Sequence, residues 1–555
     1  MSKDSNLNSL CQLLLKNEKE AADRIYLRQP KKGIWHELTW AETMLQARKV
    51  AAFLYQLGLK KGDHVAIISK NCAEWFIADF GIYLAGMVSV PLFTNQHEKS
   101  VHYILEHGDV NAVFIGKLDE HQLVRSYIPE QHMTISFGYH KDLKVNHLWS
   151  DVLATQPLIE LTEPSPEDVY TIIYSSGTSG LPKGAMFTNQ SITNYLNLFP
   201  EDLLRIRKLE HYKLISYLPL AHVYERSAIQ LASVTIHCDV SFIESLAQFS
   251  KNLRSIQPIF FTAVPRIWGI FQQKIEEKLS PSLLNFLLKI PFISRYIKNK
   301  IIKELGLNAC TNSFSGASPL PVSIIKFFEK IGIRIQEGYG QTENLAYATL
   351  SILNERRPGY VGTPRLEVEI KTAEDGELLL NSPCLMSGYY KDKEATKKAF
   401  TSEGWLRTGD VVELDDQNRV KIVGRISENF KNQSGEFVAP TPIEQQFEIN
   451  EIIEQLCLVG RGLPSNVLLI TLSEGALIRK KKEEINKLLE DILHHVNSGL
   501  LKYERISHII IAKEEWTPKN DLLTPTLKVK RRVVEQHYAG VIESALAQSQ
   551  RIIWE

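Results

Sequence analysis

The chain lacks a long hydrophobic run. Among its 555 residues, no stretch approaches the roughly 18 consecutive apolar residues that a membrane-spanning helix needs. The first twenty residues also lack the apolar centre of a secretory signal peptide. We therefore expect a cytoplasmic chain that does not cross a membrane, and we leave open whether it touches a membrane surface.

Cysteine is scarce and scattered. The six cysteines form no C-x-x-C pair, and they stand at Cys11, Cys72, Cys238, Cys310, Cys384 and Cys457. Such spacing argues against a disulfide framework and fits a reducing compartment. The sequence also offers no cluster with the ligand spacing of a zinc site.

An excess of charge of either sign is absent. Lysine plus arginine number 64, aspartate plus glutamate also number 64, and the net charge is +0. A nucleic-acid-binding protein usually carries a basic excess, so we expect no nucleic-acid partner. The length exceeds what one hydrophobic core supports, which predicts two to four domains.

Helical and strand patterns alternate in the first part of the chain. Residues 41–57 have apolar positions at helical spacing, and residues 64–69 form a short apolar run that predicts a buried strand. A helical pattern over 74–86 and a strand pattern over 87–92 follow. This alternation predicts a layered α/β fold with parallel strands.

The pattern changes near residue 360. Short alternating segments with turn signals predict β-hairpins or a small barrel-like unit there. After Arg425 the chain becomes a compact α+β stretch with a charged helix predicted over 478–496. We place the domain boundary near residue 426, which gives a large domain, 1–426, and a small one, 427–555.

One glycine-rich stretch, "YSSGTSGLPKGAM" (174–186), follows a strand pattern and precedes a predicted helix over 189–199. Glycines let backbone N–H groups face a common ligand, hydroxyls add donors and lysine adds a positive charge, a combination that suits a polyphosphate. The Walker pattern is absent, because Pro182 stands five residues after Gly177. A flexible surface loop is the alternative. The candidate phosphate-binding residues are Ser175, Ser176, Gly177, Thr178, Ser179, Gly180 and Lys183.

This stretch resembles the phosphate loop of the adenylate-forming superfamily, and further motifs agree with it in order. They are "YLPLAHVYER" (217–226), "SGASPL" (315–320), "EGYGQTEN" (337–344), "GWLRTGDVVELDDQNRVKIVGR" (404–425), "FKNQSGEFVAPTPIE" (430–444) and "LTPTLKVKRR" (523–532). The resemblance spans roughly residues 40 to 532. The 217–226 and 430–444 motifs are most similar to those of long-chain fatty acyl-CoA synthetases.

The resemblance implies an α/β fold in which a large N-terminal domain of layered α/β subdomains and a β-rich subdomain precedes a small, mobile α+β C-terminal domain. It implies a ligase that uses ATP, Mg²⁺ and coenzyme A to activate a long-chain fatty acid through acyl-AMP. Two alternatives stay open: another acceptor, such as an acyl carrier protein or an amine, or a non-catalytic acyl- or nucleotide-binding scaffold. The oligomeric state is not predicted.

The resemblance also assigns roles within residues 337–344. Tyr339 is expected at the adenine and Thr342 at the α-phosphate, and Glu343 is expected to bind Mg²⁺, a cation that prefers carboxylate and phosphate oxygens. Thr178 is the second expected metal contact. The remaining nucleotide-binding candidates of this segment are Glu337, Gly338 and Gly340.

Further expected roles lie toward the C-terminus. Asp410 is expected to bind the ribose hydroxyls, and Arg425 to support the ribose or phosphate. Lys528 is expected to stabilise the α-phosphate and the acyl carboxylate during adenylation. Ser427 is the expected hinge. It departs from the relatives' pattern, where Asp or Lys is usual, and a small residue still tolerates a backbone rotation.

The acyl pocket is expected beside Gly316 and His222, although a purely structural role for this histidine stays open. Gly316, Ala317 and Ser318 are expected to pack against the adenine and the acyl chain. The neighbouring Glu225 and Arg226 suggest an internal ion pair.

Residues 280–306 combine leucine, isoleucine and phenylalanine with five basic residues, Lys289, Arg295, Lys298, Lys300 and Lys303. This composition suits an amphipathic surface that meets anionic lipid headgroups. Pro291 interrupts the segment, and the core packing of two short helices explains it equally well.

Overall fold

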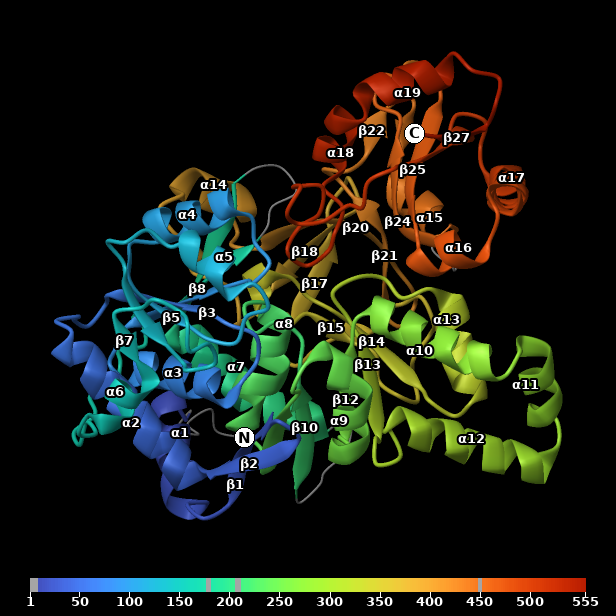
Figure 1. The fold of residues 1–555 in the computed structure, drawn as a ribbon. Helices are drawn as coiled ribbons and strands as arrows, with labels where there is room; N and C mark the ends of the chain where they lie inside the picture. Colours follow the sequence, from blue (N-terminus) through green and yellow to red (C-terminus); the bar gives the residue numbers. More distant parts are fainter. Residues whose placement is uncertain (1–7, 176–180, 205–210, 448–451) are drawn as a thin grey trace.

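The computed structural model describes residues 8–175, 181–204, 211–447 and 452–555. Figure 1 shows a large body formed by the first three quarters of the chain, with the C-terminal segment folded as a smaller unit against one side of it. Strands and helices alternate through most of the sequence. The fold is therefore mixed α/β with a large N-terminal and a small C-terminal domain, as predicted.

The largest sheet has eight strands in the order β19-β9-β8-β4-β3-β5-β6-β7. Its central strands pair in parallel, and α3 (Ala73–Leu84), buried along its whole length, packs beside α2 (Trp40–Gln56). Strands buried on both faces need near-continuous apolar runs, which is the pattern that residues 64–69 and 87–92 show. The strands are β3 (His64–Ile68), β4 (Val88–Leu92), β5 (Val110–Ile115), β6 (Met133–Ser136), β7 (His147–Leu148), β8 (Val169–Ser175), β9 (Lys183–Thr188) and β19 (Gly388–Tyr389).

Two further sheets complete the α/β body. One has the order β10-β11-β1-β2, and the other has the order β12-β13-β14-β15-β16. The first sheet contains β1 (Ile25–Lys31), β2 (Ile34–Thr39), β10 (Tyr212–Ser216) and β11 (Cys238–Phe242). The second contains β12 (Phe260–Ala263), β13 (Asn312–Ser315), β14 (Ile335–Tyr339), β15 (Thr349–Leu350) and β16 (Thr363–Pro364).

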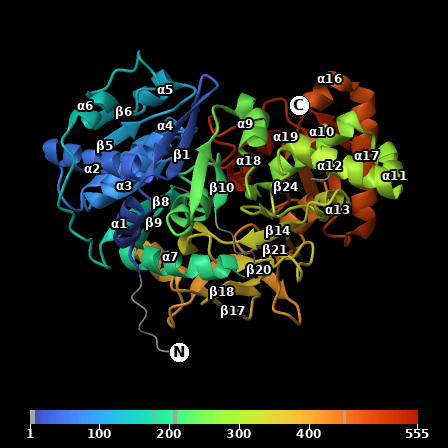
Figure 2. The ribbon, with the colours of Figure 1, turned by 90° about the horizontal axis from the view of Figure 1, so that it is seen from below.

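The hairpins predicted after residue 360 form one antiparallel sheet in the order β17-β18-β20-β21. Its strands are β17 (Glu369–Thr372), β18 (Glu377–Asn381), β20 (Leu406–Leu414) and β21 (Val420–Arg425). Within the described residues β17 and β21 are the two unpaired ends of this order, so the unit is an open sheet and not a barrel. Figure 2 shows it below the larger sheets, near α7.

The C-terminal unit has its own core around the sheet β24-β25-β26-β27. The predicted charged helix over 478–496 is divided: α16 (Glu474–Arg479) ends first, and α17 (Lys482–Gly499) follows. The strands of the unit are β22 (Phe430–Lys431), β23 (Phe437–Val438), β24 (Ile453–Val459), β25 (Asn466–Leu472), β26 (Ile506–Ile511) and β27 (Ile552–Trp554). Its other helices are α15 (Pro440–Glu444), α18 (Arg531–His537) and α19 (Ala539–Leu546).

Residues 280–306 form two helices, α11 (Pro281–Leu288) and α12 (Pro291–Leu305), each with proline in its first turn, where the missing N–H costs nothing. Both views place this pair at the edge of the molecule. The remaining α-helices are α1 (Leu10–Glu20), α4 (Glu98–His107), α5 (His121–Ser126), α6 (Trp149–Ala154), α7 (Asn189–Leu204), α8 (Val223–Glu225), α9 (Phe249–Ile256), α10 (Pro265–Lys278), α13 (Val322–Lys330) and α14 (Lys393–Ala399). A π-helix follows α8 at Arg226–Leu231, and short 3₁₀ helices lie at Leu246–Gln248 and Thr342–Asn344. In the described ranges, no helix combines the length and apolarity needed to cross a membrane.

Candidate active site

The C-terminal unit carries residues 523–532 to the surface of the large domain. The Asn95 side chain donates a hydrogen bond to the Pro525 carbonyl at 3.0 Å. Nearby, the Lys519 ammonium lies 2.7 Å from the Glu120 carboxylate. These contacts hold the loop that contains Lys528 against the large domain.

Lys528 is exposed, and its charge lies within electrostatic range of charged groups of the large domain. Its loop is closed on itself, because the Lys528 N–H donates to the Thr524 hydroxyl at 3.0 Å and the Thr524 N–H donates back to the Lys528 carbonyl at 2.7 Å. Leu527, the residue before it, has a φ of +63°, a strained value for a non-glycine residue. Desolvation by the surrounding protein and then the Arg425 guanidinium lower the pKa of Lys528, although its side chain is still reached by solvent. Nearby carboxylates act in the opposite direction, those of Asp410, Glu428 and Glu343.

Asp410 is the centre of a hydrogen-bonded network at the end of the antiparallel sheet. The Tyr339 hydroxyl and the Gln341 amide each donate to its Oδ2 at 2.6 Å, and Arg425 Nε donates to its Oδ1 at 2.8 Å. The two strands pair Asp410 directly with Arg425, and the aspartate raises the pKa of that arginine. A carboxylate oxygen accepts two hydrogen bonds, so capacity for a ribose hydroxyl remains on Oδ1.

Glu343 lies in the short turn after β14 and faces the strand β19. Tyr389 donates its hydroxyl to Glu343 Oε1 at 2.7 Å. Among the described residues, none donates to Oε2, which leaves one carboxylate oxygen for a cation. The donor set therefore fits Mg²⁺, which needs one or two protein carboxylates when substrate phosphates supply further oxygens. The described ranges contain no group of three or more His, Cys, Asp or Glu side chains arranged as a closed metal site.

The glycine-rich stretch is the connection of a hairpin. β8 ends at Ser175, β9 begins at Lys183, and these two residues are paired across the strands. The strand predicted before the stretch (β8) and the helix predicted after it (α7) are confirmed, but β9, which lies between the loop and α7, was not predicted. Lys183 is exposed, with its ammonium 5.2 Å from the centre of the Tyr389 ring. The candidates Ser176, Gly177, Thr178, Ser179 and Gly180 lie outside the described residues.

Residues 316–318 and 337–344 leave little space for larger side chains at their glycines. Ala317 has a φ of +69°, and a side chain on Gly316 would meet the Tyr224 ring at 3.3 Å. A side chain on Gly340 would meet the backbone of Ala346 at 2.4 Å, which explains why glycine stands there. Ser318 is exposed beside Ala317, and Thr342 and Gly338 are half-buried. Strain of this kind persists where the surroundings enforce it, as at binding sites.

Glu337 is buried, and its carboxylate accepts a hydrogen bond from the Gly359 N–H at 3.0 Å. Burial raises the pKa of Glu337 to about 7. This hydrogen bond fixes the backbone at Gly359, so the carboxylate has a structural partner in the folded protein.

His222 caps the short helix α8, because its Nδ1 accepts a hydrogen bond from the Tyr224 N–H at 3.1 Å. Burial and then the Lys528 charge lower the pKa of His222 to about 4. The ring is therefore neutral near pH 7, and it contacts Phe93 edge-on. This is the chemistry of a pocket wall and a helix cap and not of a general base at neutral pH.

The suggested ion pair between Glu225 and Arg226 was wrong. Arg226 donates to Asp79 at 2.6 Å, and both side chains are almost completely buried. Glu225 instead accepts hydrogen bonds from Ser216 and from the Tyr217 N–H. Adjacent residues on a helical turn point in different directions, so neighbouring charges rarely pair.

Three supporting residues were missed from the sequence: Gln341, Tyr389 and Arg531. Arg531 stands in the basic run after Lys528, yet it is largely buried and forms a bidentate pair with Glu444 at 2.6 and 2.8 Å. It also donates to the Leu458 carbonyl at 2.7 Å. The basic run after Lys528 predicts a solvent-exposed face, because all its members are charged. No local feature of the sequence distinguishes the largely buried Arg531 from its neighbours.

Comparisons with known proteins agree with this arrangement. The AMP-binding enzyme family matches residues 15–390, and the AMP-binding enzyme C-terminal domain matches residues 431–550. The long-chain-fatty-acid–CoA ligase FadD15 of Mycobacterium bovis is 27% identical over 589 residues, which cover 97% of each chain. The long-chain-fatty-acid–CoA ligase 6 of Mus musculus is 27% identical over 576 residues, which cover 91% of this chain and 82% of the mouse protein.

Among solved structures, the adenylation domain of a carboxylate reductase from Mycobacterium chelonae superposes with a TM-score of 0.82 at 22% identity, covering 98% of this chain and 92% of that one. At this identity the likeness concerns the fold. The match to the AMP-binding enzyme, in contrast, extends over more than half of the sequence. The chain therefore belongs to the AMP-binding enzyme family.

Proposed function

We propose that this protein is an AMP-forming ligase that activates a long-chain fatty acid with ATP and transfers the acyl group to coenzyme A. The observation that carries the proposal is the hydrogen-bonded cluster at Asp410, to which Tyr339, Gln341 and Arg425 donate. The exposed Lys528 of the C-terminal unit lies within electrostatic range of this cluster. A positive charge between the proposed nucleotide site and Glu343, the proposed metal ligand, would stabilise the negative charge that builds up at the α-phosphate during adenylation. The names of the relatives support the fatty acid and coenzyme A as substrates.

In the first half-reaction, a carboxylate oxygen of the acid attacks the α-phosphorus of ATP, the bond to the β-phosphate breaks, and pyrophosphate leaves. The carboxylate is already ionised, so the step needs charge stabilisation more than a base. Lys528 and Thr342 would contact the α-phosphate, and Asp410 and Tyr339 would hold the ribose and the adenine. Glu343, with Thr178, would hold Mg²⁺, which neutralises phosphate charge when bound.

We assign the phosphate contacts to Lys183, Ser175 and residues 176–180, and the adenine and acyl walls to residues 316–318, Gly338, Gly340 and Glu337. The neutral His222 ring would form part of the acyl pocket. These roles are compatible with the chemistry of each group, because apolar and neutral surfaces suit the acyl chain while donors suit the phosphates.

In the second half-reaction, the thiol sulfur of coenzyme A attacks the acyl carbon, the bond to AMP breaks, and the thiol proton passes to solvent. Lys528 must leave to admit the thiol, which a rotation of residues 427–555 would achieve. Ser427 and Ile426 are exposed just after β21 ends, so the backbone there can turn without disturbing a core.

Two alternatives make different predictions. An acyl carrier protein or an amine as acceptor would share the first half-reaction, and a carboxylate reductase contains an adenylation domain of this fold. A non-catalytic scaffold would bind nucleotide without releasing pyrophosphate. The presence of Lys528, Glu343 and Asp410 at their motif positions supports a catalyst over the scaffold.

The test is pyrophosphate release with ATP, Mg²⁺ and fatty acids from acetate to an 18-carbon acid, with and without coenzyme A. We expect release to peak with long acids and to turn over repeatedly with coenzyme A. Lys528→Ala should lower the adenylation rate about 10²–10³-fold, as for other preorganised charge stabilisers. The matched control is Lys530→Ala, because this lysine of the same loop pairs with Asp521.

Each other outcome contradicts a part of the proposal. A single turnover that coenzyme A does not restart would mean that the acceptor is a different molecule. Nucleotide binding without pyrophosphate release for any acid would favour the scaffold. Equal losses in the two lysine variants would refute the role given to Lys528.

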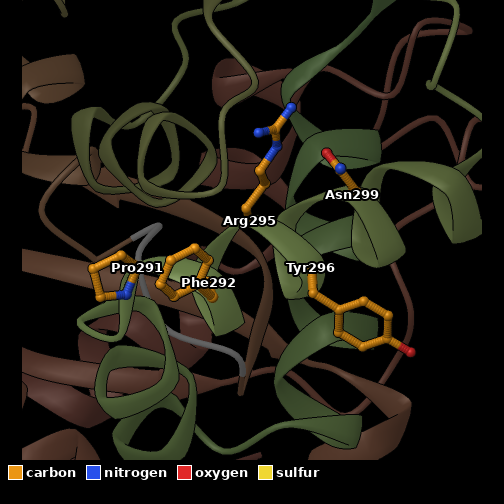
Figure 3. A pocket seen from close by; sticks show the side chains of 5 residues that line it. All are labelled: Pro291, Phe292, Arg295, Tyr296 and Asn299. Atoms are coloured by element: carbon orange, nitrogen blue, oxygen red, sulfur yellow. The ribbon is translucent and has the colours of Figure 1, made fainter.

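We also propose that the helices α11 and α12 contact an anionic membrane surface. The face of α12 that carries Phe292, Arg295, Tyr296, Asn299 and Lys303 at helical spacing is turned outward, and Phe292 is 91% exposed. Figure 3 shows an open hollow on this face, lined by its first four members and Pro291. The opposite face packs into the protein through Ile297 and Ile301. Exposed aromatic rings beside basic side chains are typical of interfacial helices.

Sedimentation with vesicles tests this contact. We expect binding to phosphatidylglycerol-containing vesicles and weak binding to pure phosphatidylcholine. Replacing Arg295 and Lys303 by Gln should weaken binding about 30-fold, at about 1 kcal/mol for each charge near the surface. Phe292→Ser should weaken vesicle binding, whereas the control Phe437→Ser, at an exposed phenylalanine of the C-terminal unit, should not. This pair distinguishes binding through one face from nonspecific hydrophobic adsorption. Equal binding by all variants would refute the assignment.

A further inference from the structure

Tyr389 touches both charged partners expected at the triphosphate. Its hydroxyl donates to Glu343 Oε1 at 2.7 Å, and its ring lies 5.2 Å from the Lys183 ammonium. One side chain thus links the carboxylate proposed to hold Mg²⁺ with the lysine that follows the glycine-rich loop.

The backbone fixes this side chain from several sides. β19 pairs with β9, which sets Tyr389 opposite Ala185, and the Tyr389 N–H donates to the Thr396 hydroxyl at 2.8 Å. Three residues earlier, the Met386 N–H donates to the Glu343 carbonyl at 2.8 Å. The segment 386–389 therefore binds the backbone of Glu343 as well as its side chain.

The next residue, Tyr390, makes a different set of contacts. Its hydroxyl donates to Asp109 at 2.7 Å, and its ring lies against His64 and His107. Tyr389 ends β19 and Tyr390 begins the turn after it, so the two side chains meet different partners. Tyr389 and Tyr390 thus each donate to a carboxylate, but only Tyr389 donates to the proposed metal ligand.

We infer that Tyr389 is a positioning residue, which holds Glu343 in the orientation that presents Oε2 to Mg²⁺ and supports Lys183 beside it. This inference rests on the proposed function. A ligating carboxylate is usually oriented by a hydrogen bond from outside the metal's own ligands, and loss of such a partner typically lowers metal affinity 10- to 100-fold. An ordinary phenol keeps its proton at neutral pH, so the Tyr389 hydroxyl is a donor to this carboxylate.

The test measures binding, independent of turnover. Titration calorimetry with a non-hydrolysable α,β-methylene analogue of ATP, in Mg²⁺ and in EDTA, gives the factor by which Mg²⁺ tightens binding. Tyr389→Phe removes the hydroxyl and keeps the ring, so we expect this factor to fall about 10-fold or more while affinity in EDTA is unchanged. The control Tyr390→Phe should match the wild type. Tyr389→Leu also removes the ring and should weaken binding in EDTA as well, through Lys183.

A double-variant cycle separates positioning from general damage. In a Glu343→Gln background, Tyr389→Phe should cause no further loss of the Mg²⁺ factor, because the carboxylate that it orients is gone. A Tyr389→Phe protein that keeps the wild-type Mg²⁺ factor, or loses affinity equally in Mg²⁺ and EDTA, overturns the inference alone. A wild-type protein that binds the analogue equally with and without Mg²⁺ overturns the proposed function and this inference with it.

Discussion

Glu225 should make the stability of the large domain depend on pH. Its side chain is fully buried, and burial raises its pKa to about 8. Asn71, Ser216 and the Tyr217 N–H all donate to its Oε1, while Oε2 is without a partner among the described residues. The folded protein therefore holds this proton up to about pH 8, whereas an unfolded glutamate loses it near pH 4.5.

Between pH 5 and 8 the folded state binds one proton more than the unfolded state at this residue, so stability falls as pH rises. Each pH unit is worth about 1.4 kcal/mol, which gives about 4 kcal/mol over three units. For a domain of about 400 residues, this corresponds to a melting temperature lower by about 5 °C. Glu225→Gln resembles the protonated acid in shape, accepts the same hydrogen bonds through its Oε1 and has no proton to lose.

The assay compares the melting temperatures of the wild type and Glu225→Gln from pH 5 to 8. We expect the difference between the two proteins to change by about 5 °C in favour of the glutamine variant as the pH rises. The control is Glu413→Gln, at an exposed strand position, which should follow the wild type. Parallel curves for the wild type and Glu225→Gln would refute the buried, protonated glutamate.

Three further predictions concern the site. Arg531→Gln breaks the buried pair with Glu444, so it should destabilise the C-terminal unit by about 3 kcal/mol and slow pyrophosphate release, because the Lys528 loop loses its anchor. The control Arg532→Gln, at an exposed position, should do neither, and equal melting temperatures of the two variants would contradict this reasoning. Asp410→Asn removes the charge that Arg425 binds and should weaken ATP binding about 10- to 100-fold by calorimetry, and unchanged affinity would refute the ribose assignment. Ser427→Pro restricts the proposed hinge and should slow acyl transfer to coenzyme A in single-turnover experiments while acyl-AMP still forms; Ser427→Ala should leave both steps intact, and a proline variant with normal transfer would place the hinge elsewhere.

The general plan of the fold was predictable because it rests on local patterns. The helical spacing over 41–57 and the apolar run over 64–69 became α2 and β3 with shifts of one residue, since burial requires periods that the sequence displays directly. The antiparallel hairpins after residue 360 were predicted from their turn residues. The strand β9 was missed, because its six residues follow the glycines without a turn signal of their own.

The candidate residues of the site could be named from the sequence, whereas their contacts could not. Motifs identified Lys528, Asp410, Arg425 and Glu343 as candidates, since each motif is a short segment that can be read without the fold. Gln341 could have been suspected as a polar neighbour within residues 337–344, whereas Tyr389 lies outside every quoted motif and had no signal in the sequence.

The sequence by itself determined the succession of elements, the family and the chemical groups available to the site. Only the tertiary structure decided that the loop with Lys528 docks on the large domain through Pro525 and Lys519, that Arg531 pairs with Glu444, and that Glu225 and Arg226 turn away from each other. It also decided that one face of α12 is left in solvent. The physical reason is that these outcomes depend on partners from distant segments, brought together by packing that no local period encodes.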